Sequence, residues 1–99
     1  MVYVASDSHE NAQKALVSFV IERVLLNVGQ LALDQVGHRL YEKHQCYFSD
    51  CLQSPQYLRE VLEELFGDSY KSITIEIQKR LAELQDQKPI ANFLSVILK

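Results

Sequence analysis

Hydrophobic residues recur every three or four positions along most of the chain, which is the spacing of one face of an α-helix. The pattern breaks near Gly29, across residues 45–53, at Gly67 and just before Pro89. Four or five amphipathic helices separated by short connections account for these breaks. We therefore predict an all-α fold, a compact bundle of four to five helices that forms one domain over residues 1–99.

The first helix is predicted to begin at a capping box. Asp7 is followed three residues later by Glu10, so each side chain can satisfy a free backbone N–H at a helix start. Beyond this point the apolar positions form two groups around the helix instead of one stripe. The first group is Val17, Val20, Ile21, Val24, Leu25 and Val28, and the second is Ala12, Ala15, Leu16, Phe19 and Leu26.

A helix that is apolar on two sides lies at the centre of its own fold or shares one side with a second subunit. For the second group we predict a symmetric homodimer interface made by Leu16, Phe19 and Leu26, with Glu22 and Arg23 at its rim. Small and large residues together allow two helices to approach closely and interdigitate. The alternative is that the C-terminal helix folds back over this face within one chain.

Glycine, serine and proline bound the following helices. Gly29 predicts a break or kink, because glycine costs about 1 kcal/mol in a helix interior relative to alanine. Gly37 predicts close approach of a neighbouring backbone to the second helix. Ser54 followed by Pro55 predicts a helix start, and Gly67 predicts a helix stop with positive φ.

Residues 72–77 alternate polar and β-branched side chains, which is a strand pattern. A helical stripe passes through the same segment and continues through Ile77 and Leu81 to Leu84. Because so long a stripe does not arise from a strand and an unrelated tail, we predict a helix from Tyr70 to Gln85. A final helix follows Pro89, and its apolar face consists of Ile90, Phe93, Leu94, Ile97 and Leu98.

The composition excludes several classes of protein. With 47% apolar residues, 23% charged residues and two cysteines, the chain is not disordered, collagenous or disulfide-dense. Its net charge of −3 argues against nucleic acid or an acidic membrane as a partner. The first residues lack the pattern of a signal peptide, and no apolar run reaches the ~20 residues of a membrane span. We therefore expect a soluble, cytoplasmic protein that makes no membrane contact.

One stretch contains side chains of the metal-binding type, namely His38, His44, Cys46 and Cys51. Zinc sites need four ligands and place their cysteine pairs about two to four residues apart, whereas this pair is at the edge of that range and has no second pair. Cysteine is also among the most often buried residue types. We predict reduced, metal-free thiols and no cofactor, against the alternatives of a structural metal or a disulfide.

The sequence offers no convincing catalytic site. A cysteine with one of the neighbouring histidines could supply a nucleophile and a base, yet no glycine-rich turn accompanies them. The carboxylates have the spacing of the solvated face of an amphipathic helix. They are Glu60, Glu63, Glu64 and Asp68. We predict no catalytic residues, and hence that the chain is not an enzyme.

DNA binding is the alternative function. Lys79 and Arg80 form the single adjacent basic pair, and Glu76 and Glu83 flank it. A helix-turn-helix protein needs a basic, exposed recognition helix, and the helix after Gly67 is too apolar and too neutral for that role. A small dimeric transcription-associated DNA-binding protein would show affinity for generic duplex DNA that weakens steeply with salt.

Several motifs follow one another between Leu25 and Leu84. They are Gly29 near a helix start, LYEK at residues 40–43, Ser54-Pro55, LREVLEELFG at residues 58–67 and an apolar helix from Tyr70 to Leu84. In this order they resemble the nitrosopumilus-type output domains, a small archaeal family of helical domains. The chain departs from the pattern of that family after Lys43, where it has His44-Gln45-Cys46 instead of an aromatic-Gly-apolar step.

The family provides terminal modules of sensory and response-regulator chains and also occurs as short stand-alone proteins. It has no established catalytic residues. The resemblance therefore implies a non-catalytic interaction or signal-output role. We expect a homodimer that acts in signal transduction and contacts another protein.

Overall fold

The computed structural model describes the backbone of residues 4–99 and the side chains from Asn11 onward. Five α-helices and three short 3-10 helices make up this part of the chain, and no strand occurs in it. The α-helices are α1 (Val4–Val28), α2 (Gln30–His44), α3 (Pro55–Phe66), α4 (Tyr70–Leu81) and α5 (Lys88–Ile97), and the 3-10 helices are η1 (Phe48–Asp50), η2 (Gly67–Ser69) and η3 (Ala82–Leu84). The predicted all-α bundle is confirmed.

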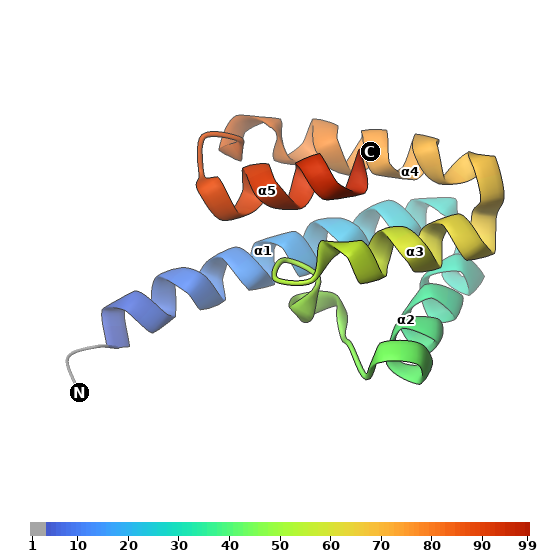
Figure 1. The fold of residues 1–99 in the computed structure, drawn as a ribbon, viewed down its shortest axis with the longest axis horizontal. Helices are drawn as coiled ribbons and strands as arrows, with labels where there is room; N and C mark the ends of the chain where they lie inside the picture. Colours follow the sequence, from blue (N-terminus) through green and yellow to red (C-terminus); the bar gives the residue numbers. More distant parts are fainter. Residues whose placement is uncertain (1–3) are drawn as a thin grey trace.

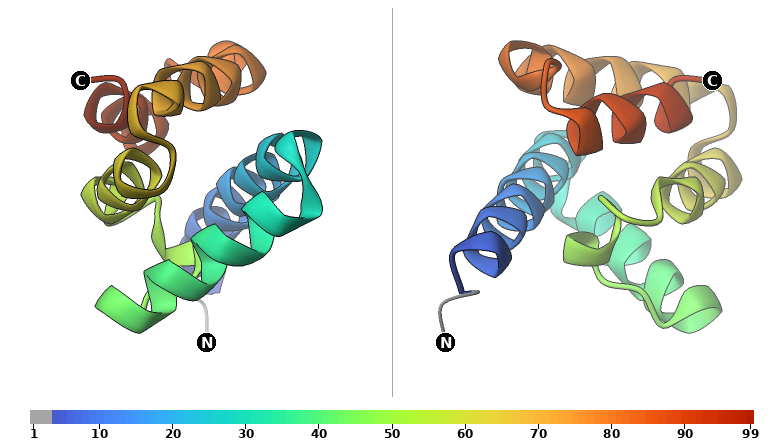
Figure 2. Two further views of the ribbon diagram at one scale, coloured as in Figure 1. Left: turned by 90° about the vertical axis from the view of Figure 1, so that its right-hand side faces the viewer. Right: turned by 60° about the vertical axis from the view of Figure 1, so that its left-hand side comes forward.

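The helices pack around one side of α1. α2 and η1 contact α1 on one flank, and α4 contacts it on another. α3 packs against α2, and α5 lies against α3 and α4 (Figures 1 and 2). The first turns of α1 extend past the other helices, and the molecule measures 44 × 27 × 21 Å (Figure 1).

The core is one continuous cluster to which all five helices contribute. Its largest fully buried side chains are Phe93, Ile21, Leu25, Leu40, Leu58, Leu62, Ile77, Leu81, Ile90 and Ile97. The first apolar group of α1 belongs to this core, except that Val28 at the end of the helix is 55% exposed.

The first helix begins earlier than the capping box predicts. α1 starts at Val4, so Asp7 lies inside the helix instead of at its N-terminus. No glycine or proline interrupts residues 4–28, and nothing in Val4-Ala5-Ser6 stops a helix from extending toward the N-terminus. The predicted start is therefore wrong, and the side chains of Asp7 and Glu10 lie outside the described residues.

Glycines end two of the helices as predicted. Gly29 separates α1 from α2 with φ +158° and ψ 154°, and Gly67 ends α3 with φ +57°. Residues with a Cβ rarely adopt either conformation. Ser54 precedes α3 and Pro55 occupies its first turn, although the Ser54 side chain makes no capping hydrogen bond.

The segment with strand-like alternation is helical. Ile73 and Ile77 are buried, whereas Ile75 between them is 46% exposed. A strand would place all three isoleucines on one face, because its side chains repeat every two residues. α4 and η3 together carry the helical backbone to Leu84, which confirms the predicted helix to within one residue of its end.

Gly37→Ala is expected to raise the free energy of unfolding by about 0.5–1 kcal/mol, because alanine loses less backbone entropy in a helix interior. The Phe48 ring, and not a neighbouring backbone, lies against Gly37, and a Cβ would stand 3.4 Å from Phe48 Cε2. This is an ordinary contact distance. Urea denaturation of both proteins measures the difference, and a loss of stability would mean that the ring cannot accept the added methyl group.

Candidate functional site

One side of α1 presents apolar residues to solvent. Phe19 is 59% exposed, Leu26 is 39% exposed and Leu16 is 38% exposed. Ala12 and Ala15 on the same side are also exposed. We call these five residues the α1 face. These five residues are the second apolar group that the sequence periodicity identifies. The structure leaves all of them at the surface.

The C-terminal helix does not cover the α1 face. α5 packs against α3 and α4, and its residues Phe93, Leu94 and Ile97 are buried in the core. Folding of this helix over the α1 face within one chain, the alternative that the sequence leaves open, is therefore not the arrangement in the structure.

Opposite charges lie on the two sides of the middle of the α1 face, and we call these sides its Glu22 edge and its Arg23 edge. Consecutive residues of an α-helix are about 100° apart around its axis, so Glu22 and Arg23 lie on either side of the line through Phe19 and Leu26. The Glu22 carboxylate accepts a hydrogen bond from Ser18 Oγ at 3.2 Å. Both side chains are exposed.

Arg23 differs from the other arginines in its surroundings. Among the side chains that the structure describes, no carboxylate lies within 4.0 Å of its guanidinium. Each of the other arginines has such a neighbour: Arg39 with Glu64 at 3.0 Å, Arg59 with Glu63 at 3.8 Å and Arg80 with Glu76 at 3.5 Å. No ion pair within residues 11–99 therefore competes with a partner from another chain for the Arg23 guanidinium.

A groove of about 340 Å³ runs along the Glu22 edge of the α1 face. Its walls come from α1, α2 and the segment around η1, and consist of Ser18, Glu22, Gly37, Tyr47, Phe48 and Ser49. Tyr47 is 61% exposed, and its ring centroid lies 5.4 Å from that of Tyr41. The groove thus offers a carboxylate on one wall and an aromatic ring on another, a combination that attracts cations.

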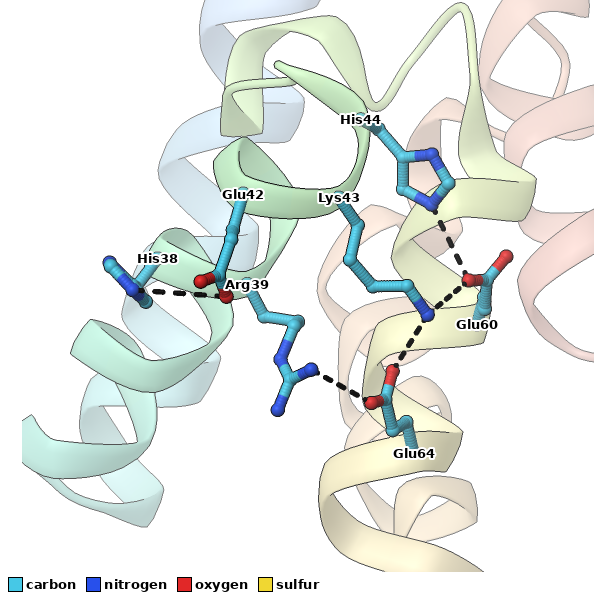
Figure 3. Close-up of polar contacts among 7 residues, drawn as sticks. All are labelled: His38, Arg39, Glu42, Lys43, His44, Glu60 and Glu64. Atoms are coloured by element: carbon cyan, nitrogen blue, oxygen red, sulfur yellow. Dashed lines mark hydrogen bonds and ion pairs between the residues drawn. The ribbon is translucent and has the colours of Figure 1, made fainter.

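A second polar cluster joins α2 to α3 (Figure 3). Lys43 Nζ lies 2.8 Å from a Glu60 oxygen and 3.1 Å from a Glu64 oxygen. Arg39 lies 3.0 Å from Glu64, and His44 Nε2 lies 3.4 Å from Glu60. Two members of the carboxylate run therefore hold α2 against α3, instead of lying unpaired in solvent as the sequence pattern predicts.

This cluster makes stability depend on pH at both ends of the scale. Hydrogen bonding to Lys43 lowers the pKa of Glu60, and the same contacts with Glu60 and Glu64 raise the pKa of Lys43. The Glu60 contribution is present above its ordinary pKa of 4.5 and is lost as pH falls through the lowered value. The Lys43 contribution is present below 10.5 and is lost as pH rises through the raised value.

Lys43→Met is therefore expected to lower the urea midpoint at pH 7. Its difference from the wild type should shrink below pH 4.5 and above pH 10.5, where the wild-type pair loses one of its charges. Lys71→Met is the control, since Lys71 is exposed and has no ion pair within the described part of the chain. A difference that stays constant over this whole pH range would show that the ion pair contributes nothing.

The two thiols lie buried at the connection between α2 and α3. Cys46 is 4% exposed, Cys51 is 0% exposed, and both are free. Their Sγ atoms donate to the same Tyr47 carbonyl oxygen, at 3.6 Å and 3.7 Å. Burial raises the pKa of both thiols, which disfavours the thiolate that nucleophilic catalysis and metal binding require.

The histidines near these thiols point to other partners. His44 stacks on Tyr57 with 3.9 Å between ring centroids, and His38 lies 3.9 Å from Glu42. Among the described side chains, no group of three or more His, Cys, Asp and Glu is placed to hold a metal ion. The arrangement brings Cys46 and Cys51 together but does not assemble them with His38 and His44 into the metal site that the sequence analysis names as an alternative.

Comparison with known proteins adds no family. No protein-family model, curated protein or solved structure matches the chain. Within residues 4–99, no helix has both the length and the apolar character that crossing a membrane demands. The α1 face, its two charged edges and the adjoining groove are the surface features that bear on function.

Proposed function

We propose that this chain is a non-catalytic interaction module that pairs with a second copy of itself through the α1 face. The observation that carries the proposal is the exposure of Phe19 at 59%, with Leu16 at 38% and Leu26 at 39% on the same side of α1. Full burial of a fully exposed aromatic side chain is worth about 1.5–3 kcal/mol, and pairing would supply the share of this that belongs to the 59% of Phe19 still in solvent. Leu16 and Leu26 on either side extend the surface that pairing would bury.

A second copy suits this surface because the surface is complementary to itself. One edge carries the Glu22 carboxylate and the other carries the Arg23 guanidinium, which has no ion pair among the described side chains, so one patch provides both halves of an ion pair. Ala12 and Ala15 leave room for large side chains of the facing helix. Symmetric pairs that use one patch twice are the commonest oligomers.

The biological role that we propose is signal output. The resemblance of residues 25–84 to archaeal output domains supports this role, in which the dimer acts in the cytoplasm and contacts a further protein. The α1 face would serve dimer formation, and the surfaces of α3, α4 and α5 would stay accessible to that protein. No catalytic step belongs to this role.

Phe19→Glu tests the proposal. Light scattering at tens of micromolar should give the wild type twice the 11.4 kDa mass of one chain and give the variant the mass of one chain. The variant should keep its helical circular dichroism, because the change places a charge at an interface and not in a core. Ile75→Glu is the matched control, since it puts the same charge on an exposed apolar position of α4 and should leave the dimer intact.

Three outcomes would contradict the proposal. A wild type that is monomeric at tens of micromolar has no such interface. A Phe19→Glu variant that fails to fold would place Phe19 in the core. Equal weakening of the dimer by Ile75→Glu would mean that pairing does not depend on the α1 face.

A further inference from the structure

The charged edges of α1 distinguish between the two ways in which two α1 helices can pair. Ala12, Phe19 and Leu26 are seven residues apart, so they lie nearly in a line along the helix. Glu22 and Arg23 lie on opposite sides of that line. The direction of the second helix decides which edge meets which.

When the two helices run parallel, the two-fold axis lies along them, and the Glu22 edge of each copy meets the Arg23 edge of the other. When they run antiparallel, the axis crosses them, and each edge meets its own equivalent. If the axis crosses close to these residues, Glu22 would then approach Glu22, and Arg23 would approach Arg23. Like charges held opposite each other destabilise an interface, so the charge pattern favours the parallel pair.

In a parallel pair, the Arg23 edge of one copy faces the Glu22 edge of the other copy. The groove lies on that Glu22 edge. Glu22 and Gly37 form part of its wall, and the exposed Tyr47 forms another part. Arginine pairs with carboxylates and also stacks on aromatic faces. Arg23 is the arginine that lacks a carboxylate within its own described surroundings.

We infer that the α1 helices pair in parallel and that Arg23 of each copy binds in the groove between α1 and η1 of the other copy. There the guanidinium pairs with the Glu22 carboxylate and lies against the Tyr47 ring. Two identical sites result, one on each side of a seam in which Phe19 meets Phe19 and Leu26 meets Leu26. This inference rests on the homodimer proposed above, and it assigns the groove a ligand of defined chemistry.

Cross-linking tests the direction of the helices. Ala12→Cys and Leu26→Cys, made separately, are oxidised and run on non-reducing gels. Positions 12 and 26 are about 21 Å apart along a helix, and a disulfide needs its Cβ atoms about 4 Å apart. A parallel pair lets both variants form a self-disulfide, whereas an antiparallel pair leaves at least one of the two pairs about 21 Å apart.

The wild type is the control for this oxidation, because its buried Cys46 and Cys51 should give no cross-linked dimer. Self-disulfides at both positions support the inference. A self-disulfide at one position alone, or at neither position in a protein that is dimeric by light scattering, overturns it while leaving the proposed homodimer standing. A monomeric wild type overturns both.

Charge exchange tests the groove. Arg23→Glu should raise the dimer dissociation constant about tenfold or more in sedimentation equilibrium, because it places a second carboxylate against Glu22. The double variant Glu22→Arg with Arg23→Glu should recover most of this loss, since the two edges have then exchanged charge. Lys71→Glu makes the same change of charge on α4 and should leave the dissociation constant unchanged.

Tyr47→Leu tests the aromatic wall. It should weaken the wild-type dimer about two- to fivefold, the range of an exposed cation–aromatic contact. The same change in an Arg23→Ala background should have no effect. An equal effect in both backgrounds, or no recovery in the charge-exchanged double variant, would place Arg23 outside the groove.

Discussion

Phe93→Ala is expected to lower the free energy of unfolding by about 3–5 kcal/mol, the usual cost of removing a buried phenylalanine side chain. Phe93 is 0% exposed and lies on α5, which packs against α3 and α4. The cavity left behind cannot collapse fully, because α3 and α4 both pack against α5. Small domains have about 5–15 kcal/mol of stability in total, so the variant should be close to its folding threshold.

Urea denaturation followed by circular dichroism measures this loss. Phe19→Ala is the matched control, compared with the wild type at a concentration where both are monomeric. Because Phe19 is 59% exposed, the control should change stability by less than about 0.5 kcal/mol. A loss below about 1 kcal/mol for Phe93→Ala would show that α5 does not hold its place in the core.

Ile75→Pro is expected to lower the free energy of unfolding by about 3 kcal/mol or more. Residue 75 lies in the interior of α4, where proline removes a backbone donor and clashes with the preceding turn. Its side chain is 46% exposed, so little of the loss comes from packing. Ile75→Ala separates the two effects, because it shortens the side chain and leaves the helix intact.

The comparison of these two variants is made by the same urea denaturation. Backbone chemical shifts of the wild type give an independent check, since residues 73–77 should show helical values. Equal stability of Ile75→Pro and Ile75→Ala, or extended shifts over this segment, would contradict the helical assignment.

The sequence predicts the helices well because their signals are local. The stripe through Ile73, Ile77 and Leu81 identifies α4 in spite of the alternating residues within it. Gly67 and Pro55 bound α3 through their own backbone preferences. The start of α1 is harder to predict, because a capping box at Asp7 competes with residues before it that also accept a helix.

The surroundings of α1 could not be derived from periodicity. The spacing of Leu16, Phe19 and Leu26 identifies an apolar side but does not say what covers it. α5 has an apolar face that could pack on α1 or on α3 and α4, and this choice depends on the whole bundle. Only the assembled fold shows that the α1 face is left exposed.

The groove was missed for a related reason. Its residues come from three segments, and Tyr47 belongs to a connection in which the helical spacing is lost. The partners of Lys43 were missed as well, because Glu60 and Glu64 approach it only after the chain has turned back. A basic last turn of one helix followed by an acidic face on the next is the signal that could have suggested this contact.

The connection between α1 and α2 has a mechanical consequence. Gly29 alone separates the two helices, and its N–H donates to the Leu25 carbonyl at 3.0 Å while its own carbonyl accepts from the Leu33 N–H at 3.2 Å. α2 is tied in turn to α3 by Lys43 and its two glutamate partners. A change in the direction of α1 relative to α2 would therefore have to break one of these two hydrogen bonds or turn α2, and with it the ion pairs to α3, as one unit.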